Sequence, residues 1–577
     1  KSWHKKERTW GVFLLKMKNN GKELDPRAFS EEERHHFNTS DSLEWSQWLK
    51  NGVVRLLSPA EAKKIPRHKI FTVPLRMVRT NKSEALDALL AKSRLVAPGH
   101  LDPQLGEFRS DAPTTHPVAV NLALTIAASL GWPVYLFDVQ TAFLSGKATS
   151  REVYVRAPKD GLPATASSKP VEPQTLMQVL KSIYGLVEAP RLWYQRAVEL
   201  LESVGFEELT SCRATFVLVC DGLVQAICCL HVDDGLLVGQ LKLPKVAVIK
   251  EKIDDVFTIK EWKHIQQKAG RYLGEELSQD SNFEIKKSMG HYFEKILPVD
   301  IPKGAQPEDN YEQRTPLRSL VMKLSWPARK LMSGISYGVS LAAQKITEAT
   351  VATAKEVNKL LKTAEGEVAA GRGEITFRKI DLANPVIVTY FDASYANEQG
   401  GHSQAAMYSL ATDDRVATVP CNANAVEHQT NKIARVVRST FAAEGSAMSM
   451  AIDRHLYARL LFRVLLYGEA EAHLDGDWRR HLRVGARSLY DHMQTTGSMP
   501  AERSAMLDLL AAKELVEGGV IRFRWTPTHG QLADHLTKQM TCLALQRYLR
   551  TGQICLTQTE EQKKLESHLR GLRKGQR

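Results

Sequence analysis

Two adjacent aspartates in a predicted hairpin are the first residues whose types and spacing could support chemistry. Asp233 and Asp234 lie between apolar runs at 226–232 and 235–239 that are rich in β-forming residues. This pattern predicts a hairpin with both carboxylates at its tip. Asp-Gly is also ordinary turn chemistry, and the chain repeats it at Asp221-Gly222. The pair therefore indicates a reactive site only if a further carboxylate lies beside it.

Asp138 is a candidate for that further carboxylate. It ends an apolar predicted strand that begins at Pro133, and the chain stays apolar after it. A carboxylate in such a run is costly to bury unless it is paired or binds a cation. With the pair at 233–234 it could hold two Mg²⁺ ions, because hard cations prefer carboxylate oxygens and leave positions open for phosphate. Two such ions can activate a hydroxyl group and carry a departing pyrophosphate.

Three acids in the C-terminal part of the chain form a second candidate set. Asp392 ends another apolar predicted strand, and Asp534 follows a His-Gly loop. Glu444 lies on the apolar face of a predicted helix with Ala447 and Met448, where a solvated carboxylate would be unusual. These acids could form a second metal site that hydrolyses a phosphodiester.

The composition is that of a globular protein with a polyanionic partner. At 577 residues the chain is long enough for about three or four domains. The formal charge of +13 favours a polyanion, with nucleic acid the leading candidate. No apolar run reaches the roughly 20 residues of a membrane span, and the basic start is not a signal peptide. Because the chain begins with Lys1, we expect it to be a fragment of a longer polypeptide.

The cysteines indicate a reducing compartment. Their number, seven, is odd and no paired CxxC spacing is present, so neither a structural zinc site nor a disulfide framework is predicted. Cys228 and Cys229 are expected to be buried small hydrophobes in a strand. We expect an intracellular protein that is neither secreted nor bound to a membrane.

Several predicted elements position these acids. Lys92 and Arg94 have the same parity on one predicted strand and share a face, which is either solvated or grips phosphate. The break at Glu365–Gly373 is predicted to be a domain boundary. The other predicted elements are helices at 42–54, 117–131, 193–204 and 439–466, a mostly helical region at 317–362, and strands at 71–78, 91–97, 385–392 and 521–525.

The order of motifs resembles the reverse transcriptase of Ty1/copia-type LTR retrotransposons. The matching segments are Phe137-Asp-Val-Gln-Thr-Ala-Phe-Leu144, Glu152-Val-Tyr-Val, Ser182-Ile-Tyr-Gly-Leu-Val-Glu-Ala-Pro190, Trp193-Tyr194, His231-Val-Asp-Asp234, Tyr272-Leu-Gly, Leu277-Ser-Gln, Ser319-Leu-Val and Ile335-Ser-Tyr-Gly-Val339. Phe391-Asp-Ala, Ser439-Thr-Phe-Ala-Ala-Glu444 and Leu532-Ala-Asp-His-Leu-Thr-Lys538 resemble the ribonuclease H of the same family. The resemblance spans about residues 42–550.

The resemblance implies an α/β (α+β) fold: a right-hand polymerase with fingers, palm and thumb, followed by an RNase H-like domain. The implied divisions are a polar tail at 1–41, fingers and palm at 42–300, a helical thumb or connection at 301–373, the RNase H-like domain at 384–550 and a charged tail at 551–577.

The resemblance also assigns roles to the candidate residues. Asp138, Asp233 and Asp234 match the palm's metal ligands, and Asp392, Glu444 and Asp534 match those of the RNase H site. The metal would be Mg²⁺, with Mn²⁺ as an alternative. Phe143 matches an aromatic that stacks under the incoming sugar and excludes a ribose 2′-hydroxyl. Lys92 and Arg94 match residues that hold the triphosphate. Gly185 matches a position where bare backbone lies against nucleotide and template.

The implied activity is RNA-directed DNA polymerase. Its partners would be an RNA template, a DNA primer, the RNA–DNA hybrid, dNTPs and other Pol and Gag products of the same element. The implied location is a cytoplasmic virus-like particle with access to the nucleus. Two rival interpretations stay open: a decayed copy that binds nucleic acid without catalysis, and a cellular binding protein that has co-opted the fold.

The sequence departs from the family pattern at three positions. His231 replaces an aromatic or apolar residue before Val-Asp-Asp, and we expect it to alter efficiency rather than abolish activity. Gly485 stands where the RNase H pattern has an acid, and Asp491 is a doubtful substitute. We therefore expect this domain to fold but to cleave RNA poorly or not at all. Gly334 stands where an aspartate is expected. A product-release role for His529 competes with that of an ordinary loop histidine.

Overall fold

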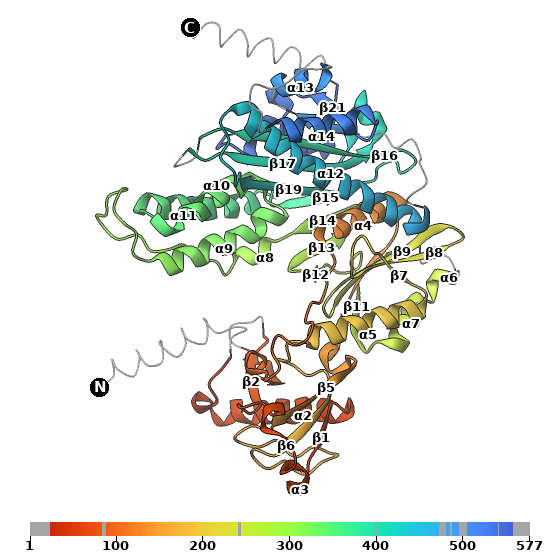
Figure 1. Cartoon of the computed structure of the whole chain (residues 1–577), viewed down its shortest axis with the longest axis vertical. Helices are drawn as coiled ribbons and strands as arrows, with labels where there is room; N and C mark the ends of the chain where they lie inside the picture. The colour runs from red at the N-terminus through yellow and green to blue at the C-terminus, as the bar shows by residue number, and fades with distance from the viewer. Residues whose placement is uncertain are drawn as a thin grey trace. The chain divides into compact units, whose positions relative to one another are not determined.

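A computed structural model of the chain describes most of its residues, and these form two compact units (Figure 1). The described ranges are 23–83, 88–240, 244–397, 401–471, 481–484, 487–495, 505–540 and 542–557. Unit 1 comprises the described residues up to Thr114, Val139–Gly205 and Lys252–Lys260. Unit 2 comprises Thr115–Asp138, Phe206–Glu251 and the described residues from Glu261 onward.

Helix α2 (Glu31–Lys50) is the main helix against which the core of unit 1 packs. Ser30 and Glu33 form a capping box at its start, which satisfies free backbone N–H groups. The predicted start at residue 42 is therefore wrong, because the charged first turns continue the same helix. Trp45 and Trp48 are fully buried in the core beneath it. Leu43, expected on the apolar face, is 61% exposed.

Two small sheets complete unit 1. One has the order β1-β6-β5 and the other pairs β2 with β3 in antiparallel register. The predicted strand at 71–78 forms only from Arg76, whereas the predicted strand at 91–97 is confirmed. The elements are β1 (Val54–Leu56), α3 (Pro59–Ala62), β2 (Arg76–Asn81), β3 (Ala91–Val96), β5 (Ala148–Arg156), β6 (Leu176–Lys181) and α5 (Ala189–Val204), with short 3-10 turns η1 (Pro26–Ala28), η2 (Arg67–Lys69), η3 (Gly99–Leu101) and η4 (Ala142–Ser145).

A six-stranded sheet in the order β11-β4-β10-β9-β8-β7 is the first layer of unit 2. Its strands are β4 (Val134–Val139), β7 (Glu207–Glu208), β8 (Thr215–Cys220), β9 (Leu223–His231), β10 (Asp234–Gly239) and β11 (Ile259–His264), the last of which begins in unit 1. The predicted core helix is confirmed as α4 (Pro117–Leu130), with Gly131 in the left-handed C-cap. Its buried face shares a core with Val134 and Leu136. Cys228 and Cys229 are buried in β9, as predicted.

A four-stranded sheet and a group of helices follow. The sheet has the order β12-β13-β14-β15, with strands at Gly270–Tyr272, Glu275–Gln279, Ile285–Ser288 and Glu374–Phe377. The helices are α6 (Pro244–Ala247), α7 (Ile249–Val256), which passes into unit 1 at Lys252, α8 (Gly290–Phe293), α9 (Arg314–Lys330), α10 (Ser333–Gln344), the 3-10 turn η5 (Ile346–Glu348) and α11 (Val351–Ala369). Helix α11 continues through most of the predicted break at 365–373, and the chain turns only at Gly371, whose φ is +69°.

The C-terminal part of unit 2 is a five-stranded sheet in the order β19-β17-β16-β20-β21. Central β16 (Pro385–Ser394) is antiparallel to β17 (Gln404–Asp413) and parallel to β20 (His481–Val484). Helix α12 (Thr440–Glu471) packs on β16 and β17 and also on α4 (Figure 1). The other elements are η7 (Asp414–Ala417), β18 (Cys421–Asn422), β19 (Asn424–Lys432), α13 (Arg487–Gln494), α14 (Met506–Glu517), β21 (Arg522–Trp525), η9 (Thr528–Gly530), η10 (Asp534–Leu536), α15 (Leu543–Thr551) and β22 (Gln553–Ile554).

One hydrophobic core joins the layers of unit 2. It contains side chains of α4, the six-stranded sheet, α9–α11 and the C-terminal sheet. Buried polar contacts cross the same junction: Asn121 of α4 donates to the Val426 carbonyl of β19 at 2.8 Å, and it accepts from Lys287 of β14 at 2.8 Å. In the described parts of the chain, no helix is long and apolar enough to cross a membrane.

Candidate functional site

The predicted hairpin is present, and its turn is shifted by one residue from the expected Asp-Asp-Gly. Strands β9 and β10 pair His231 with Asp234, so Val232 and Asp233 form the two-residue turn and Asp234 opens β10. Asp234 also pairs with Asp138 of β4 as its direct antiparallel partner. The structure therefore brings the three acids together at one edge of the six-stranded sheet.

Two backbone features fix this hairpin. Val232 has a φ of 57°, a conformation that is strained for a β-branched residue and costs on the order of 1–3 kcal/mol. A Cβ atom on Gly235 would lie 2.0 Å from the ring of Phe137. Gly235 is thus required by the close approach of an aromatic ring from β4 rather than by the turn. Phe137 in turn packs on Trp262 of β11, with ring centroids 4.8 Å apart.

Burial and like-charge repulsion act together on the hairpin acids. The pKa of Asp234 is raised to about 6, first by burial and then by like-charge repulsion from Asp233 and Asp138, while Lys263 opposes the rise. The three carboxylates are half-buried and remain open to solvent. Among the described residues, no group of three or more His, Cys, Asp or Glu side chains is arranged as a metal site. A metal held here would complete its ligand shell with phosphate oxygens and water.

The second set of acids is assembled inside the C-terminal sheet and is almost fully buried. Asp392 lies on β16, Glu444 in the first turns of α12 and Asp534 in η10, with exposures of 4%, 4% and 3%. Thr537 donates a hydrogen bond to Asp392. The Lys538 ammonium lies 3.3 Å from Asp392 Oδ2 and 3.1 Å from Asp534 Oδ1. The structure therefore adds a lysine that the sequence prediction did not include.

The charges of this second set oppose one another strongly. Burial raises the pKa of Glu444 well above its ordinary value, with repulsion from Asp392 acting in the same direction. Burial and Asp392 raise the pKa of Asp534 to about 6, against the attraction of Lys538. Glu444 Oε2 and Asp534 Oδ2 are buried without a hydrogen-bond partner. Unpartnered buried carboxylate oxygens suit a hard cation, so these residues fit a metal.

The remaining predicted residues lie together in unit 1. Lys92 and Arg94 point to solvent from β3, and the Arg94 guanidinium lies 5.6 Å from the ring centroid of Tyr184. The ring of Phe143 meets the same tyrosine edge-on at 5.8 Å. Tyr184 thus connects the predicted phosphate-binding arginine to the predicted sugar-contacting aromatic. Its neighbour Gly185 has a φ of +89°, and a Cβ atom there would lie 2.1 Å from the Ala97 carbonyl oxygen.

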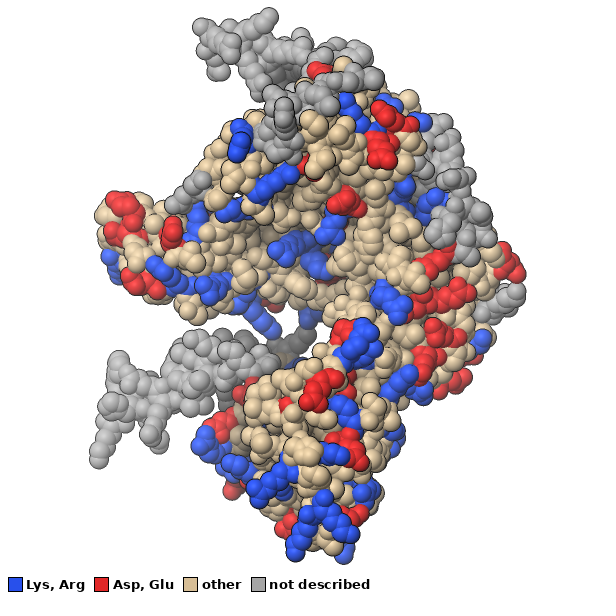
Figure 2. Space-filling view, in the orientation of Figure 1, with Lys and Arg blue, Asp and Glu red and all other residues tan. Residues whose placement is uncertain are grey.

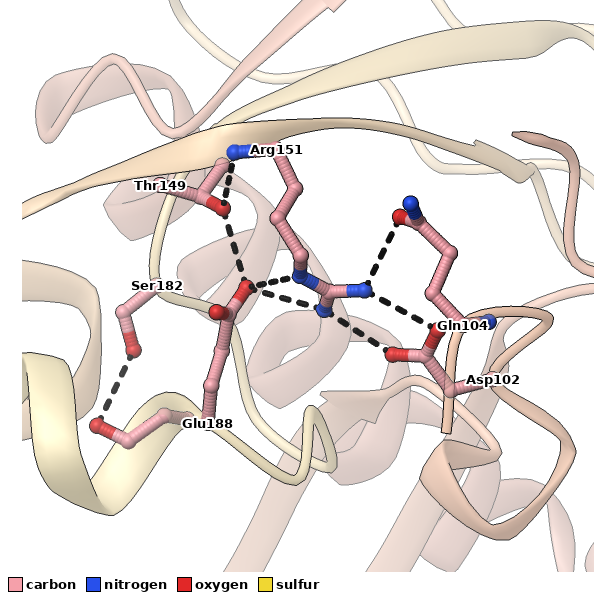
Figure 3. Close-up of polar contacts among 7 residues, drawn as sticks. Asp102, Gln104, Thr149, Arg151, Ser182 and Glu188 are labelled. Carbon is pink, nitrogen blue, oxygen red and sulfur yellow. Dashed lines mark hydrogen bonds and ion pairs between the residues drawn. The ribbon is translucent and has the colours of Figure 1, made fainter. Parts of the chain in front are cut away.

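A buried network around Arg151 joins β5 to Glu188 at the start of α5 (Figure 3). Arg151 of β5 contacts Asp102 at 3.0 Å and Glu188 at 2.9 Å, and both carboxylates are buried. Thr149 donates to the same Glu188 oxygen. Glu188 and Asp102 are 37 and 49 residues away from Arg151 in the sequence, so no local pattern reveals the network. Glu188, which belongs to a resemblance motif, thus links β5 to the start of α5.

The structure shows the location of four residues that were named in connection with departures from the family pattern. His231 is half-buried and pairs with Asp234 at the hairpin end. Asp491 lies on α13 with its side chain exposed, unlike the buried acids. His529 lies in η9 and is half-buried. Gly334 lies in the first turn of α10 with open space around it. Gly485 is outside the described residues.

Basic and aromatic side chains meet on one face of α9. Trp326 and Met322 are 41% and 52% exposed, and the Lys330 ammonium lies 5.2 Å from the Trp326 ring. Arg318 and Lys323 are exposed on the same helix. Figure 2 shows Lys and Arg side chains along the lower side of the α8 to α11 region, with Asp and Glu side chains at its outer end. This surface suits a polyanion that also presents flat apolar groups.

The stretch of chain that contains the hairpin matches a known protein family. Residues 62–317 match the family described as reverse transcriptase (RNA-dependent DNA polymerase), and this stretch contains Asp138, Asp233 and Asp234. The chain carries a reverse transcriptase domain. The resemblance of the motifs within this stretch to a reverse transcriptase is thus confirmed.

Relatives of this reverse transcriptase chain extend the similarity beyond that domain. The retrovirus-related Pol polyproteins from transposons RE2 and RE1 of Arabidopsis thaliana are 26% and 24% identical over 510 residues, which is 84% of this chain. The Pol polyprotein from transposon TNT 1-94 of Nicotiana tabacum is 26% identical over 284 residues, covering 48% of this chain and 20% of the relative. The chain spans about a third (32%) of the length of the two Arabidopsis polyproteins.

Proposed function

We propose that this chain is an RNA-directed DNA polymerase that joins deoxynucleotides to a primer 3′-hydroxyl at Asp138, Asp233 and Asp234. The observation that carries the proposal is the strand register that sets Asp234 opposite Asp138 with Asp233 in the adjoining turn. Bound Mg²⁺, or Mn²⁺ in its place, would supply Lewis-acid activation of the hydroxyl and of the leaving pyrophosphate. The three carboxylates hold the ions, and the packing of Phe137 on Gly235 keeps β10 in register with β4.

The other predicted residues contribute binding and selection in this proposal. Lys92 and Arg94 present cations to the triphosphate from the solvent face of β3. Phe143, five residues after Asp138 in sequence, excludes a ribose 2′-hydroxyl. Arg151 and Glu188 hold the Gly185 loop in place. The α9 face with Trp326 supports binding of the template–primer duplex through backbone phosphates.

The architecture supports a division into polymerase and RNase H-like parts. In this proposal unit 1 supplies the fingers, the six-stranded sheet is the palm, and α8–α11 form the thumb or connection. In the C-terminal sheet, whose order is β19-β17-β16-β20-β21, β17 is antiparallel to both of its neighbours, β19 and β16. Strands β20 and β21 run parallel to the central strand β16. That topology, with acids on β16 and α12, supports an RNase H-like domain.

Cleavage of RNA in an RNA–DNA hybrid by this second domain is proposed to be weak. Asp392, Glu444 and Asp534 are assembled, but Gly485 replaces the fourth acid of the family pattern. Fewer carboxylates give less charge to hold two ions. The assay is magnesium-dependent hybrid cleavage by the wild type and by Gly485→Asp. Robust wild-type cleavage would reject this part of the proposal, and a gain in Gly485→Asp would support it.

The wider setting is proposed from the relatives. Similarity to Pol polyproteins supports partners among the other Pol and Gag products of one element, and action in a cytoplasmic virus-like particle with access to the nucleus. The decayed-copy interpretation predicts hybrid binding without extension. The co-opted binding protein predicts hybrid binding that does not depend on magnesium.

Primer extension separates these interpretations. A 5′-labelled DNA primer on an RNA template is incubated with the wild-type chain, dNTPs and Mg²⁺, beside a reaction with EDTA. We expect extension in the first reaction and none in the second. Binding without extension in either reaction would reject the proposal. Sugar selection is read in the same assay, where Phe143→Val is expected to raise ribonucleotide incorporation and Tyr184→Phe is the matched aromatic control.

A further inference from the structure

Lys538 places a cation between two buried carboxylates of the C-terminal site. Its ammonium lies 3.1 Å from Asp534 Oδ1 and 3.3 Å from Asp392 Oδ2. The geometry follows from the short turn η10, which brings a residue four positions after Asp534 back over its side chain. Thr537 helps to hold the turn, because its hydroxyl group donates to Asp392 and lies 3.1 Å from the Asp534 carbonyl oxygen. The lysine is thus aimed at the point where the two acids face each other.

The charge balance of this site is incomplete with Lys538 alone. Three carboxylates with exposures of 4%, 4% and 3% meet one ammonium group. Two carboxylate oxygens, Glu444 Oε2 and Asp534 Oδ2, are buried and have no hydrogen-bond partner. Removing the ammonium from a buried carboxylate pair would leave charges without a counter-ion, which is strongly unfavourable. The site therefore favours a bound cation and has two unpartnered oxygens available to one of higher charge.

Lys538 has a route to solvent that the two acids lack. Its side chain is 40% exposed, whereas those of Asp392 and Asp534 are 5% and 4% exposed. The ammonium can reach water while the aliphatic stem keeps its packing.

We propose that Lys538 is an internal counter-cation that bridges Asp392 and Asp534 when no divalent ion is bound, and that gives up this place when a divalent ion enters. Lys538 then sets the concentration of divalent ion at which the C-terminal site is filled. The inference rests on the proposed metal site formed by Asp392, Glu444 and Asp534. It does not depend on polymerase activity at the hairpin.

Divalent-ion binding to the full chain tests this inference directly. The background is Asp233→Asn with Asp234→Asn, which removes the acids of the hairpin site. Mn²⁺ is titrated and the free ion is followed by its electron paramagnetic resonance signal. In this background the Lys538→Met variant is expected to bind Mn²⁺ at least about tenfold more tightly than the protein that retains Lys538, because the ion no longer has to displace a like charge. Lys538→Arg keeps the charge and is expected to bind within about threefold of the unmodified lysine.

A stability measurement supplies the second readout. Without divalent ions, Lys538→Met is expected to melt at a lower temperature than its parent, and saturating Mn²⁺ is expected to abolish the difference. If Lys538→Met does not fold, Lys538→Gln is read in the same way. Unchanged or weaker Mn²⁺ binding by these variants would overturn the inference. Failure of every variant, including the parent, to bind Mn²⁺ would reject the metal site and the inference with it, while primer extension by the wild type reports separately on the polymerase.

Discussion

The two clusters of acidic residues in this protein differ in how their mutual charge repulsion is reduced. At the hairpin, Asp138, Asp233 and Asp234 are half-buried, and burial together with repulsion from the other two acids raises the pKa of Asp234. In the C-terminal site, Asp392 and Asp534 are buried and share one ammonium group. Solvent therefore screens the carboxylate charges at the hairpin, whereas a lysine of the same chain neutralises part of the carboxylate charge in the C-terminal site.

This difference follows from where the sequence puts each set. The hairpin acids end strands at a sheet edge, where a large substrate can approach and where a permanent counter-ion would obstruct it. The C-terminal acids come from a central strand, a packed helix and a short turn, so their carboxylates lose water on folding. Burial of charge then requires a partner. The solvent exposure of the hairpin suits a polymerase site. In the C-terminal site, a metal ion would have to compete with the Lys538 ammonium for the carboxylates.

The largest expected effect is the loss of polymerase activity in Asp138→Asn. This change removes a metal-binding charge at the hairpin, and we expect extension to fall by at least about 10³-fold, as expected when electrostatic stabilisation of the transition state is lost. Asp221→Asn is the matched control, because Asp221 occupies the other Asp-Gly turn of the same sheet at a φ of 54° that Asn tolerates. Equal losses in both variants would contradict the assignment.

Gly235→Ala tests whether the hairpin depends on ring packing. The added Cβ atom would lie 2.0 Å from the Phe137 ring, so β10 must shift away from β4. We expect a destabilisation of about 1–3 kcal/mol and a 10- to 100-fold loss of extension. Adding Phe137→Leu should restore part of both, because it removes the clashing ring. A single Gly235→Ala variant with full activity would show that the close packing is dispensable.

The pH dependence of stability should differ between the wild type and Asp534→Asn. The pKa of Asp534 is about 6 in the folded protein against an ordinary 3.8, so the folded state holds this proton more tightly. Without divalent ions, stability is therefore lost as pH rises from about 4 to about 6, by up to about 3 kcal/mol. Asp534→Asn should flatten this part of the curve, as measured by urea unfolding at each pH. An unchanged slope would mean that the buried site is not the source.

Val232→Gly should have the smallest effect. Glycine accepts the φ of 57° without strain, although it makes the unfolded chain more flexible. We expect a net gain in stability of about 1 kcal/mol and a modest change in extension, measured by thermal unfolding and single-turnover kinetics. A large loss of extension with intact stability would assign a catalytic role to the strained backbone.

Much of the hairpin could be predicted from the chain alone. Asp138 was identified because an apolar strand that ends in a carboxylate is unusual, and Glu444 because it interrupts an apolar helix face. The start of α2 was missed although Ser30 and Glu33 carry a capping signal, because the charged residues around them resemble a polar linker.

The rest depends on contacts that no local pattern records. Arg151 meets Asp102 and Glu188 across 49 and 37 residues of sequence, and only the fold brings them together. Lys538 stands in an evident motif, but its place between Asp392 and Asp534 depends on the path of η10 after β21. The shift of the turn from Asp-Asp to Val232-Asp233 depends on strand register, which hydrophobic alternation leaves open by one residue.

The most direct test of the central claim compares primer extension by two double variants. Asp233→Asn with Asp234→Asn alters the hairpin, and Asp392→Asn with Asp534→Asn alters the C-terminal site. Extension on an RNA template with Mg²⁺ should be lost in the first variant and retained in the second. Extension that survives in the hairpin variant, or that disappears only in the C-terminal one, would contradict the claim that Asp138, Asp233 and Asp234 form the polymerase site.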